Sequence, residues 1–438
     1  MTQNTIFSDE TICAISTAAG VGGIAVIRVS GSHAIAISDK IFKPLKSGKS
    51  IAEMDGNTIQ FGRIINNKNE IIDEVLISLF RNPHSFTGED VVEIGCHGSL
   101  FIQQEILKLL IENGCSMAKA GEFTQRAFLN GKLDLAAAES VMSLIGASGK
   151  QAATAALNTL DGNLSREIRK CADDIIGICA SLSAWVDYPD EDIEDTDAGD
   201  MLPIFEKTKS ALADIIRRYD CGRAVTDGID AVIVGKPNVG KSTLMNMLTG
   251  FERSIVTDIA GTTRDVVEEK IVLGEIIMRV ADTAGIRETE NVVENIGVNL
   301  AKRRLERAEL VLAVFDSSMP INGDDLDIIE QCRGKKAIAL LNKSDLPMAA
   351  DRKIIDEAFP FVVELSASTG DGRNELEKAI AEIFSTDEFN PNAACLTSER
   401  QRQCCVNALS SIEEAIDAVN LGVTLDAINV CADCAINA

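Results

Sequence analysis

The chain has 438 residues, of which 46% are hydrophobic, 25% charged and 4% aromatic. This composition is typical of a globular protein with more than one hydrophobic core, and it excludes collagen-like, mucin-like and disordered chains. The 67 acidic residues outnumber the 42 basic ones and give a net charge of −25. Nucleic-acid phosphates and anionic lipids therefore repel the chain on average, so a contact with nucleic acid must be local or assisted by a partner.

The N-terminus MTQNTIFSDE carries no basic segment, and no apolar run approaches the about 18 residues of a membrane span. We therefore expect no export signal, no membrane contact and a cytoplasmic location. The 12 cysteines then indicate reduced thiols rather than a disulfide framework. With only 3 histidines, the sequence does not favour a zinc site.

The first predicted elements are strands separated by glycines and polar stretches, at residues 11–17, 24–30, 58–65 and 74–80. They predict a mixed unit of strands and helices. From Glu122 onward the sequence is rich in alanine and leucine and predicts helices, at residues 127–147, 151–160, 166–185 and 201–225. The acidic stretch 187–200 predicts a solvated loop between two of these helices.

Near Cys221 the pattern changes to strands that alternate with helical segments, at residues 229–235, 271–281, 309–316, 336–342 and 361–367. This alternation predicts an open, mostly parallel α/β sheet that ends near Phe384. Helical patterns return at 397–419 and 424–438. The simplest layout is an α/β domain inserted into one helical domain. The predicted boundaries are 1–121 for the N-terminal domain, 122–220 with 385–438 for the helical domain, and 221–384 for the inserted domain.

The segment GKPNVGKS, Gly235 to Ser242, lies between a predicted strand and a predicted helix, which is the setting of a phosphate-binding loop. In such a loop Lys241 reaches the terminal phosphates and the Ser242 hydroxyl binds magnesium. A glycine-rich turn with a stray lysine is the alternative, and the later motifs remove it. The loop residues expected to contact nucleotide are Asn238, Val239, Gly240, Lys241, Ser242 and Thr243.

Three further motifs follow at the spacing of a GTP-binding domain. In DTAG, Asp282 lies near magnesium and the Gly285 amide near the terminal phosphate, with Thr283 and Ala284 between them. In NKSD, the Asp345 carboxylate accepts hydrogen bonds from the ring N–H and the exocyclic amine of guanine, a donor pair that adenine lacks. The sequence therefore predicts a GTPase whose base site comprises Asn342, Lys343, Asp345, Ser366 and Ala367.

Ile286 follows DTAG where many GTPases carry a glutamine that positions the attacking water. An apolar side chain cannot orient water, so hydrolysis needs another carboxylate or amide, a cation, or an arginine from a partner. Asn238 and the hydroxyl-rich loop 257–265 offer oxygens to a potassium ion. A purely local role of Asn238 in the shape of the loop remains an equal alternative. Among nearby carboxylates Glu288, Glu290 and Glu294 are equal candidates on the residues alone.

Several longer segments resemble the tRNA-modification GTPases of the MnmE family, also called TrmE. They are IAVIRVSG, HSFTGEDVVEIGCHG, AGEFTQRAFLNGKLDLAAAES, WVDYPDEDI and DTAGIRETENVVENIG. The resemblance extends over nearly the whole chain. It implies a fold with an N-terminal mixed α/β domain related to folate-dependent aminomethyl-transfer proteins, a helical domain, and an inserted Ras-like P-loop GTPase domain with a mostly parallel sheet.

The resemblance also implies roles for single residues. Glu294 would orient the attacking water, and Arg287 and Arg264 would stabilise charge or a dimer of GTPase domains, although either is equally explained as a surface arginine. Ser242 and Thr263 would hold magnesium, and the potassium site would comprise Asn238, Thr257, Ile259 and Thr262. The nucleotide would contact the loop residues Thr257, Asp258, Ile259, Ala260, Gly261, Thr262 and Thr263.

A site for 5-formyltetrahydrofolate is implied at Arg28, Glu93 and Lys132, each of which the residues alone explain as a surface charge. The segment GVGGIA, Gly20 to Ala25, imitates a dinucleotide-binding fingerprint, but a predicted strand follows it instead of a helix. The family usually ends in a CxGK tail. No CxGK is present here, so we expect a helical domain shortened at its end and less stable.

The implied function is that of a homodimeric, potassium-stimulated GTP hydrolase. With the FAD-dependent partner MnmG it would add aminomethyl-type groups to the wobble uridine of tRNA, using a one-carbon unit from a folate. The main alternative is a regulatory switch that binds RNA or acts in ribosome assembly without base chemistry. A folate-binding module with a vestigial GTPase is a third reading, against which the intact motifs argue.

Overall fold

The computed structural model describes residues 10–45, 49–187, 198–250, 268–281 and 305–438. These residues form two compact units, one up to Ala138 and one from Glu139 onward, and each is described by itself. The predicted acidic loop at 187–200 lies largely outside the described residues. Within the described ranges, no helix combines the length and the apolar character needed to cross a membrane.

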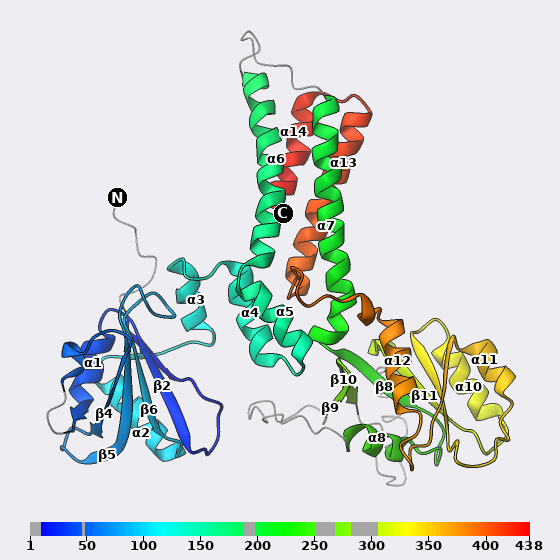
Figure 1. Cartoon of the computed structure of the whole chain (residues 1–438), viewed down its shortest axis with the longest axis horizontal. Helices are drawn as coiled ribbons and strands as arrows, with labels where there is room; N and C mark the ends of the chain where they lie inside the picture. The colour runs from blue at the N-terminus through cyan, green and yellow to red at the C-terminus, as the bar shows by residue number, and fades with distance from the viewer. Residues whose placement is uncertain (1–9, 46–48, 188–197, 251–267, 282–304) are drawn as a thin grey trace, which may run out of the picture. The chain divides into compact units, whose positions relative to one another are not determined.

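The first unit is built on a seven-stranded sheet with the strand order β3-β4-β5-β6-β2-β1-β7 (Figure 1). Neighbouring strands are antiparallel except β1 and β7, which are parallel. The strands are β1 Ile12–Ile15, β2 Ile24–Ser30, β3 Phe42–Pro44, β4 Thr58–Ile65, β5 Ile71–Phe80, β6 Val91–His97 and β7 Ser116–Met117. The helical elements are α1 Ala34–Ile41, η1 Ile51–Glu53, α2 Leu100–Glu112 and α3 Glu122–Leu129.

One face of this sheet packs against α1 and α2. On β2 the residues Ala25, Ile27 and Val29 are buried in the same core as residues of both helices, because successive side chains of a strand point to opposite faces. Each fully buried aliphatic side chain of this kind stabilises the fold by about 1.5–3 kcal/mol. The same alternation places Arg28 on the other face, where the register pairs it with Glu93 of β6.

The prediction of one helix over 127–147 is wrong. The structure has α3 end at Leu129, and α4 (Leu135–Gly146) begins after a turn. Gly131 adopts a φ of 67°, a left-handed conformation that glycine tolerates and that typically ends a helix. Lys132 therefore lies in a connecting turn and not on a helix.

In the second unit the described residues form a bundle of four helices, which run side by side in Figure 1: α6, α7, α13 and α14. They share one hydrophobic core, to which Ile175, Phe205, Ile412 and Ile428 each contribute a buried side chain. The helices of this part are α4 Leu135–Gly146, α5 Lys150–Leu160, α6 Asn163–Asp187, α7 Ala198–Thr226, α13 Glu399–Asn420 and α14 Leu425–Asn437.

The rest of the second unit is a six-stranded sheet in the order β13-β12-β11-β8-β10-β9. All neighbours are parallel except β9 and β10. The strands are β8 Ile229–Val234, β9 Glu268–Leu273, β10 Ile276–Ala281, β11 Leu310–Asp316, β12 Ala337–Asn342 and β13 Phe361–Glu364. The described helices are α8 Lys241–Thr249, α10 Gly323–Cys332, α11 Arg352–Ala358, α12 Arg373–Ile383 and η2 Thr386–Glu388.

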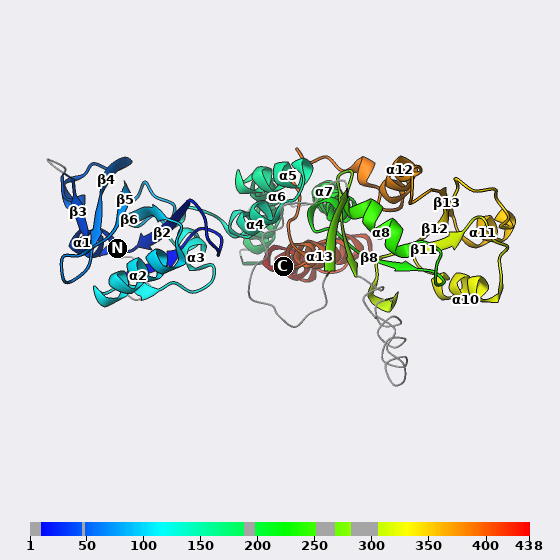
Figure 2. The same cartoon turned by 90° about the horizontal axis from the view of Figure 1, so that it is seen from below.

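The prediction of a single strand over 271–281 is also wrong, because Gly274 at a φ of 62° makes a tight turn between β9 and β10. Helices cover both faces of the sheet. Residues of α8 and α12 share one core with it, and residues of α10 and α11 share another. Figure 2 shows α12 and α10 on opposite sides of the strands.

The predicted fold class is confirmed by a mixed sheet, a helical bundle and a mostly parallel sheet with helices on both faces. In such a parallel sheet, ligands bind at the carboxyl ends of the strands. The loops after β8, β12 and β13 meet at that edge. The exact domain boundaries given above stay a prediction, since the structure divides the chain once, after Ala138.

Candidate functional site

The loop between β8 and α8 has the backbone that a phosphate site requires. Gly240 has a φ of 100°, and a Cβ there would collide with the side-chain nitrogen of Asn342. A Cβ on Gly235 would lie 2.6 Å from the carbonyl oxygen of Val314. Only glycine therefore fits at both ends of the loop. Asn238, which has a φ of 64°, is exposed at its tip.

Lys241 extends across this loop from the first turn of α8. Its Nζ donates hydrogen bonds to the carbonyl oxygens of Gly235 at 2.7 Å and of Lys236 at 2.6 Å. Burial lowers the pKa of the ammonium group. Ser242 and Thr243 follow it and are exposed at the helix start, where free backbone N–H groups attract an anion. The arrangement suits the terminal phosphates of a nucleotide, with the Ser242 hydroxyl available to a magnesium ion.

A single buried side chain joins the phosphate loop to the loop that follows β13. Asn342, at the end of β12, is 2% exposed. Its Nδ2 donates to the carbonyl oxygen of Val239 at 2.7 Å. Its Oδ1 accepts a hydrogen bond from the backbone N–H of Ala367 at 3.0 Å. The structure thus brings the predicted phosphate and base residues into one connected site.

The base side of the site is held by short hydrogen bonds. The Ser366 hydroxyl donates to Oδ1 of Asp345 at 2.7 Å, and it lies 2.9 Å from the Ser368 hydroxyl. Asp345 is exposed, so its second oxygen is free to meet a base in solution. This carboxylate matches the paired N–H donors of guanine.

Lys343 is fixed by a residue that sequence reasoning missed. Its Nζ lies 2.5 Å from Oδ2 of Asp316, at the end of β11, and its φ is 65°. Burial opposes the charge of Asp316, but the bonds from Lys343 and Ser318 hold the pKa of that carboxyl below its ordinary value. The position of Asp316 at the carboxyl end of a buried strand was the available signal.

A second missed pair anchors the outside of the phosphate loop. The Lys236 Nζ lies 2.6 Å from Oδ2 of Asp325 and donates to Oδ1 of Asn322 at 3.2 Å. The side chain of Asp325 is 3% exposed and that of Lys236 is 16% exposed. Asn322 and Asp325 also form a capping box at the start of α10. The sequence signal was that capping box, which does not reveal its partner.

Part of the predicted site lies outside the described residues. This applies to the loop Thr257, Asp258, Ile259, Ala260, Gly261, Thr262 and Thr263, to Asp282, Thr283, Ala284 and Gly285, and to Arg264, Arg287 and Glu294. Of the residues assigned to the metals, the structure describes Ser242 and Asn238. The roles of all these residues stay predictions.

In the first unit, Arg28 and Glu93 face each other across β2 and β6. Nε of Arg28 donates to Oε1 of Glu93 at 2.9 Å, and NH2 lies 2.8 Å from the same oxygen. The guanidinium lies over two aromatic rings, 5.2 Å from the centroid of Phe86 and 5.5 Å from that of Phe123. About a quarter of each charged side chain is exposed. A guanidinium stacked in this way is a preorganised surface for a planar or anionic ligand.

Lys132 comes from the turn between α3 and α4 and is exposed. Its Nζ donates to the carbonyl oxygen of Pro83 at 3.1 Å. A Cβ on Gly88 would lie 3.2 Å from Cγ of Lys132, so the turn packs closely on the loop that carries Phe86. The two phenylalanines were missed by sequence reasoning because their partner lies on another segment of the chain.

Comparison with known proteins gives two family matches. The family described as GTP-binding protein TrmE N-terminus matches residues 11–132, and the MnmE helical domain matches residues 135–438. The tRNA modification GTPase MnmE of Acetivibrio thermocellus is 42% identical over 432 residues, covering 97% of this chain and 93% of the relative. The proteins of the same name from Clostridioides difficile and Lactococcus lactis subsp. cremoris are 40% and 41% identical, covering 97% and 96% of this chain and 93% and 91% of theirs. The resemblance drawn from the sequence is confirmed, and the chain belongs to the MnmE family of tRNA modification GTPases.

Proposed function

We propose that this chain is a GTP hydrolase that acts in tRNA modification. The observation that carries the proposal is the bridge of Asn342, which holds the phosphate loop and the base loop as one site. Lys241 at one end and Asp345 at the other suit the phosphates and the guanine of the same nucleotide. Relatives of the same family carry the name tRNA modification GTPase over nearly the full length of this chain.

In hydrolysis, water attacks the terminal phosphorus and the bond to the departing GDP oxygen breaks. The helix start at Ser242 and the ammonium of Lys241 stabilise the charge that develops on the phosphate oxygens. To reach them, Lys241 must exchange its bonds with the carbonyl groups of Gly235 and Lys236 for bonds with phosphate. Magnesium, when bound, neutralises part of that charge. Ile286 has no group that can orient the water, and we assign this role to Glu294 because the family resemblance implies it.

A potassium ion completes the phosphate site in this proposal. Asn238 offers a side-chain oxygen at the exposed tip of the loop, and the hydroxyls and carbonyls of the loop from Thr257 to Thr263 offer the others. In this proposal, pairing of two GTPase domains in a homodimer completes the cation site and brings Arg287 and Arg264 to the nucleotide or to the dimer contact.

The folate proposal rests on the first unit. A 5-formyltetrahydrofolate would stack its pterin at Arg28 and the two phenylalanine rings, and Glu93 would accept its N–H donors. Lys132, exposed at the edge, suits the carboxylates of such a ligand. The one-carbon unit then serves the wobble uridine of tRNA, together with the FAD-dependent partner MnmG. Because this chain carries a net charge of −25, the partner supplies most of the attraction for tRNA in this scheme.

The test is steady-state GTP hydrolysis in potassium and in sodium at equal ionic strength, for the wild-type chain and for Glu294→Ala. We expect potassium to stimulate hydrolysis and Glu294→Ala to abolish the stimulation while GTP still binds. Modified uridines are measured in tRNA from cells depleted of the protein, and we expect them to fall. Equal rates of hydrolysis in potassium and in sodium, together with unchanged levels of modified uridines in tRNA, would favour a regulatory RNA-binding switch instead.

A further inference from the structure

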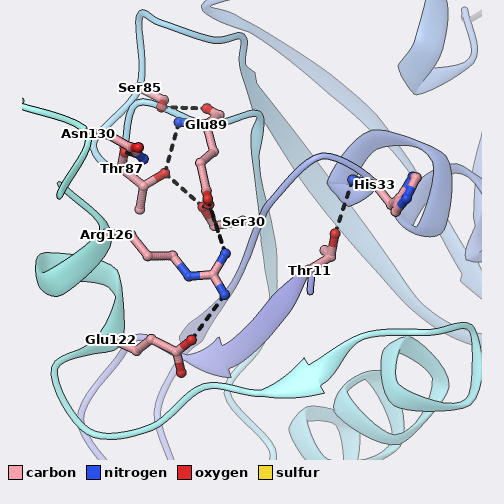
Figure 3. Close-up of polar contacts among 9 residues, drawn as sticks. All are labelled: Thr11, Ser30, His33, Ser85, Thr87, Glu89, Glu122, Arg126 and Asn130. Carbon is pink, nitrogen blue, oxygen red and sulfur yellow. Dashed lines mark hydrogen bonds and ion pairs between the residues drawn. The ribbon is translucent and has the colours of Figure 1, made fainter. Parts of the chain in front are cut away.

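A buried arginine joins two segments of the first unit (Figure 3). The side chain of Arg126, on α3, is 4% exposed. Its NH1 donates to both carboxylate oxygens of Glu89, at 3.1 and 3.2 Å, and its NH2 donates to Glu122 at 3.0 Å. Burial disfavours the charge of Glu122. The bonds from the Lys119 backbone N–H and from Arg126 nevertheless keep its pKa below the ordinary value.

Glu89 belongs in turn to a buried polar network on the neighbouring loop. Oε2 of Glu89 accepts from the Ser30 hydroxyl at 2.7 Å, and that hydroxyl lies 2.7 Å from the Thr87 hydroxyl. The side chain of Ser85 donates to the Glu89 carbonyl at 2.6 Å, and that of Asn130 donates to the Thr87 carbonyl at 2.7 Å. Figure 3 shows these groups converging between the loop and α3.

The two segments joined by Arg126 carry the two aromatic rings that contact Arg28. Phe123 directly follows Glu122 on α3, and Phe86 directly precedes Thr87 on the loop. The rings lie 5.5 and 5.2 Å from the Arg28 guanidinium. Arg126 therefore links two elements that each place an aromatic ring over the same guanidinium.

We propose that Arg126 is a positioning residue, which holds the loop of Phe86 and the helix of Phe123 so that both rings stay against the Arg28 guanidinium, where the proposed planar ligand binds. The ligand part of this inference rests on the proposed folate site. Arg126 acts through Phe86 and Phe123 and does not itself touch the ligand.

The chemistry of the cluster explains why an arginine is needed. The planar guanidinium binds Glu89 with one nitrogen and Glu122 with another, in directions set by its fixed fork. A lysine at this position keeps the charge, but its single ammonium cannot hold two carboxylates in the same geometry. Loss of the fork weakens the link between α3 and the loop. Because Asn130 and Gly88 also join these segments, we expect the protein to keep its fold while the two rings move relative to Arg28.

The experiment compares Arg126→Lys with the matched control Arg63→Lys in the full-length chain. Arg63 of β4 binds Glu74 of β5 through Nε and NH2, and this pair is about 40% exposed. Two quantities are measured, the affinity for 5-formyltetrahydrofolate by calorimetry and the NMR signal of the Arg28 Nε–H group, assigned with Arg28→Lys. The two flanking rings shift that signal, so it reports stacking without any ligand.

We expect Arg126→Lys to weaken folate binding at least tenfold and to move the Arg28 signal toward that of an unstacked arginine. Arg63→Lys should change neither. Combining Arg126→Lys with Phe86→Ala should add little to the loss of folate affinity from Phe86→Ala alone, because both changes remove the same ring contacts with Arg28. If Arg126 had only a structural role, the losses of folate affinity from Arg126→Lys and Phe86→Ala would add.

An unchanged Arg28 signal in folded Arg126→Lys would overturn the proposal, as would strictly additive losses in the double variant. If Arg126→Lys fails to fold, Glu122→Gln replaces it, since this change removes the charge from only one partner of the fork. It should then give a smaller shift in the same direction, and no shift would again overturn the proposal. If the wild-type chain binds no folate while the Arg28 signal still moves, the folate function fails and the positioning role of Arg126 stands.

Discussion

Replacing Asn342 by alanine should separate the phosphate loop from the base loop. The side chain makes two hydrogen bonds in a nearly water-free position, one to the Val239 carbonyl and one from the Ala367 N–H. Both partner groups belong to buried residues. In Asn342→Ala neither group has its side-chain partner, and the direct link between the two loops is lost.

The expected loss follows from these two groups. A buried backbone group left without its partner costs about 1–3 kcal/mol, so the two together cost about 2–6 kcal/mol in the ordered conformation. The free protein relaxes by letting the loops separate and hydrate. Nucleotide binding must then restore the order. At about 1.4 kcal/mol for each tenfold change, even the lower limit weakens GTP binding by about 30-fold.

The assay is calorimetric titration with a non-hydrolysable GTP analogue and with GDP. Because the bridge does not involve the terminal phosphate, both ligands should lose affinity by a similar factor. Asn342→Asp keeps the acceptor for Ala367 but places a carboxylate oxygen against the Val239 carbonyl, so it should bind no better than the alanine variant. Asn374→Ala, on the exposed side of α12, is the control and should bind as the wild type does. Affinity of Asn342→Ala within threefold of wild type would refute the reasoning.

Three further outcomes are expected. Asp345→Asn should weaken GTP binding by about 100-fold or more, because a guanine N–H then meets an amide donor, and xanthosine triphosphate should compete better in the same titration. Asp325→Asn leaves the buried Lys236 with a weaker partner, so it should destabilise the phosphate loop by a sizeable part of the about 3–5 kcal/mol of a broken buried pair. We expect faster hydrogen exchange of the phosphate-loop amides in this variant, and the double variant Lys236→Met with Asp325→Leu should restore slow exchange. Glu139 is partly buried at the start of the second unit. Burial opposes its charge, but its hydrogen bonds with Arg400 and neighbouring groups hold the pKa of its carboxyl below the ordinary value. The stability it contributes is therefore complete above the ordinary glutamate pKa of about 4.3 and is lost as the pH falls through the lowered value. Melting curves of Glu139→Gln should lack that acid-dependent loss, and an identical pH dependence in both proteins would contradict the assignment.

The GTP-binding part was predictable because its motifs are short and contiguous. A phosphate site of this kind is formed by neighbouring residues: a strand, a glycine-rich turn and a lysine at the helix start. The segment from Gly235 to Ser242 can therefore be recognised from the sequence alone. The bridge between motifs was not predictable. Asn342 was placed in the base site, yet its two bonds reach Val239 and Ala367, which lie far from it in sequence.

The two wrong elements have a common cause. Over 127–147 and 271–281 the apolar pattern continues across a glycine, and the pattern alone favours one long element. Gly131 and Gly274 both adopt a left-handed backbone, and each one ends an element that composition would extend. A glycine inside an apolar run was the signal for a break, and it was outweighed by the residues around it.

The site around Arg28 shows why the ligand site of the first unit could be predicted only from the family resemblance. Alternation along β2 correctly puts Arg28 on the outer face, but it gives no reason to expect a ligand there. The site needs Phe86, Phe123 and Arg126, which come from a loop and a helix beyond the strand, and no local motif connects them.

One local signal was available in Arg126 itself. It follows Glu122 by one helical turn and precedes Ala127 on the buried side of α3. A charged residue on the buried side of a short helix requires partners of opposite charge, since the cost of burying it alone is too large. Where those partners lie on a neighbouring loop, such an arginine marks the place at which two segments are held together, and the groups beside its partners are the first residues to test for a site.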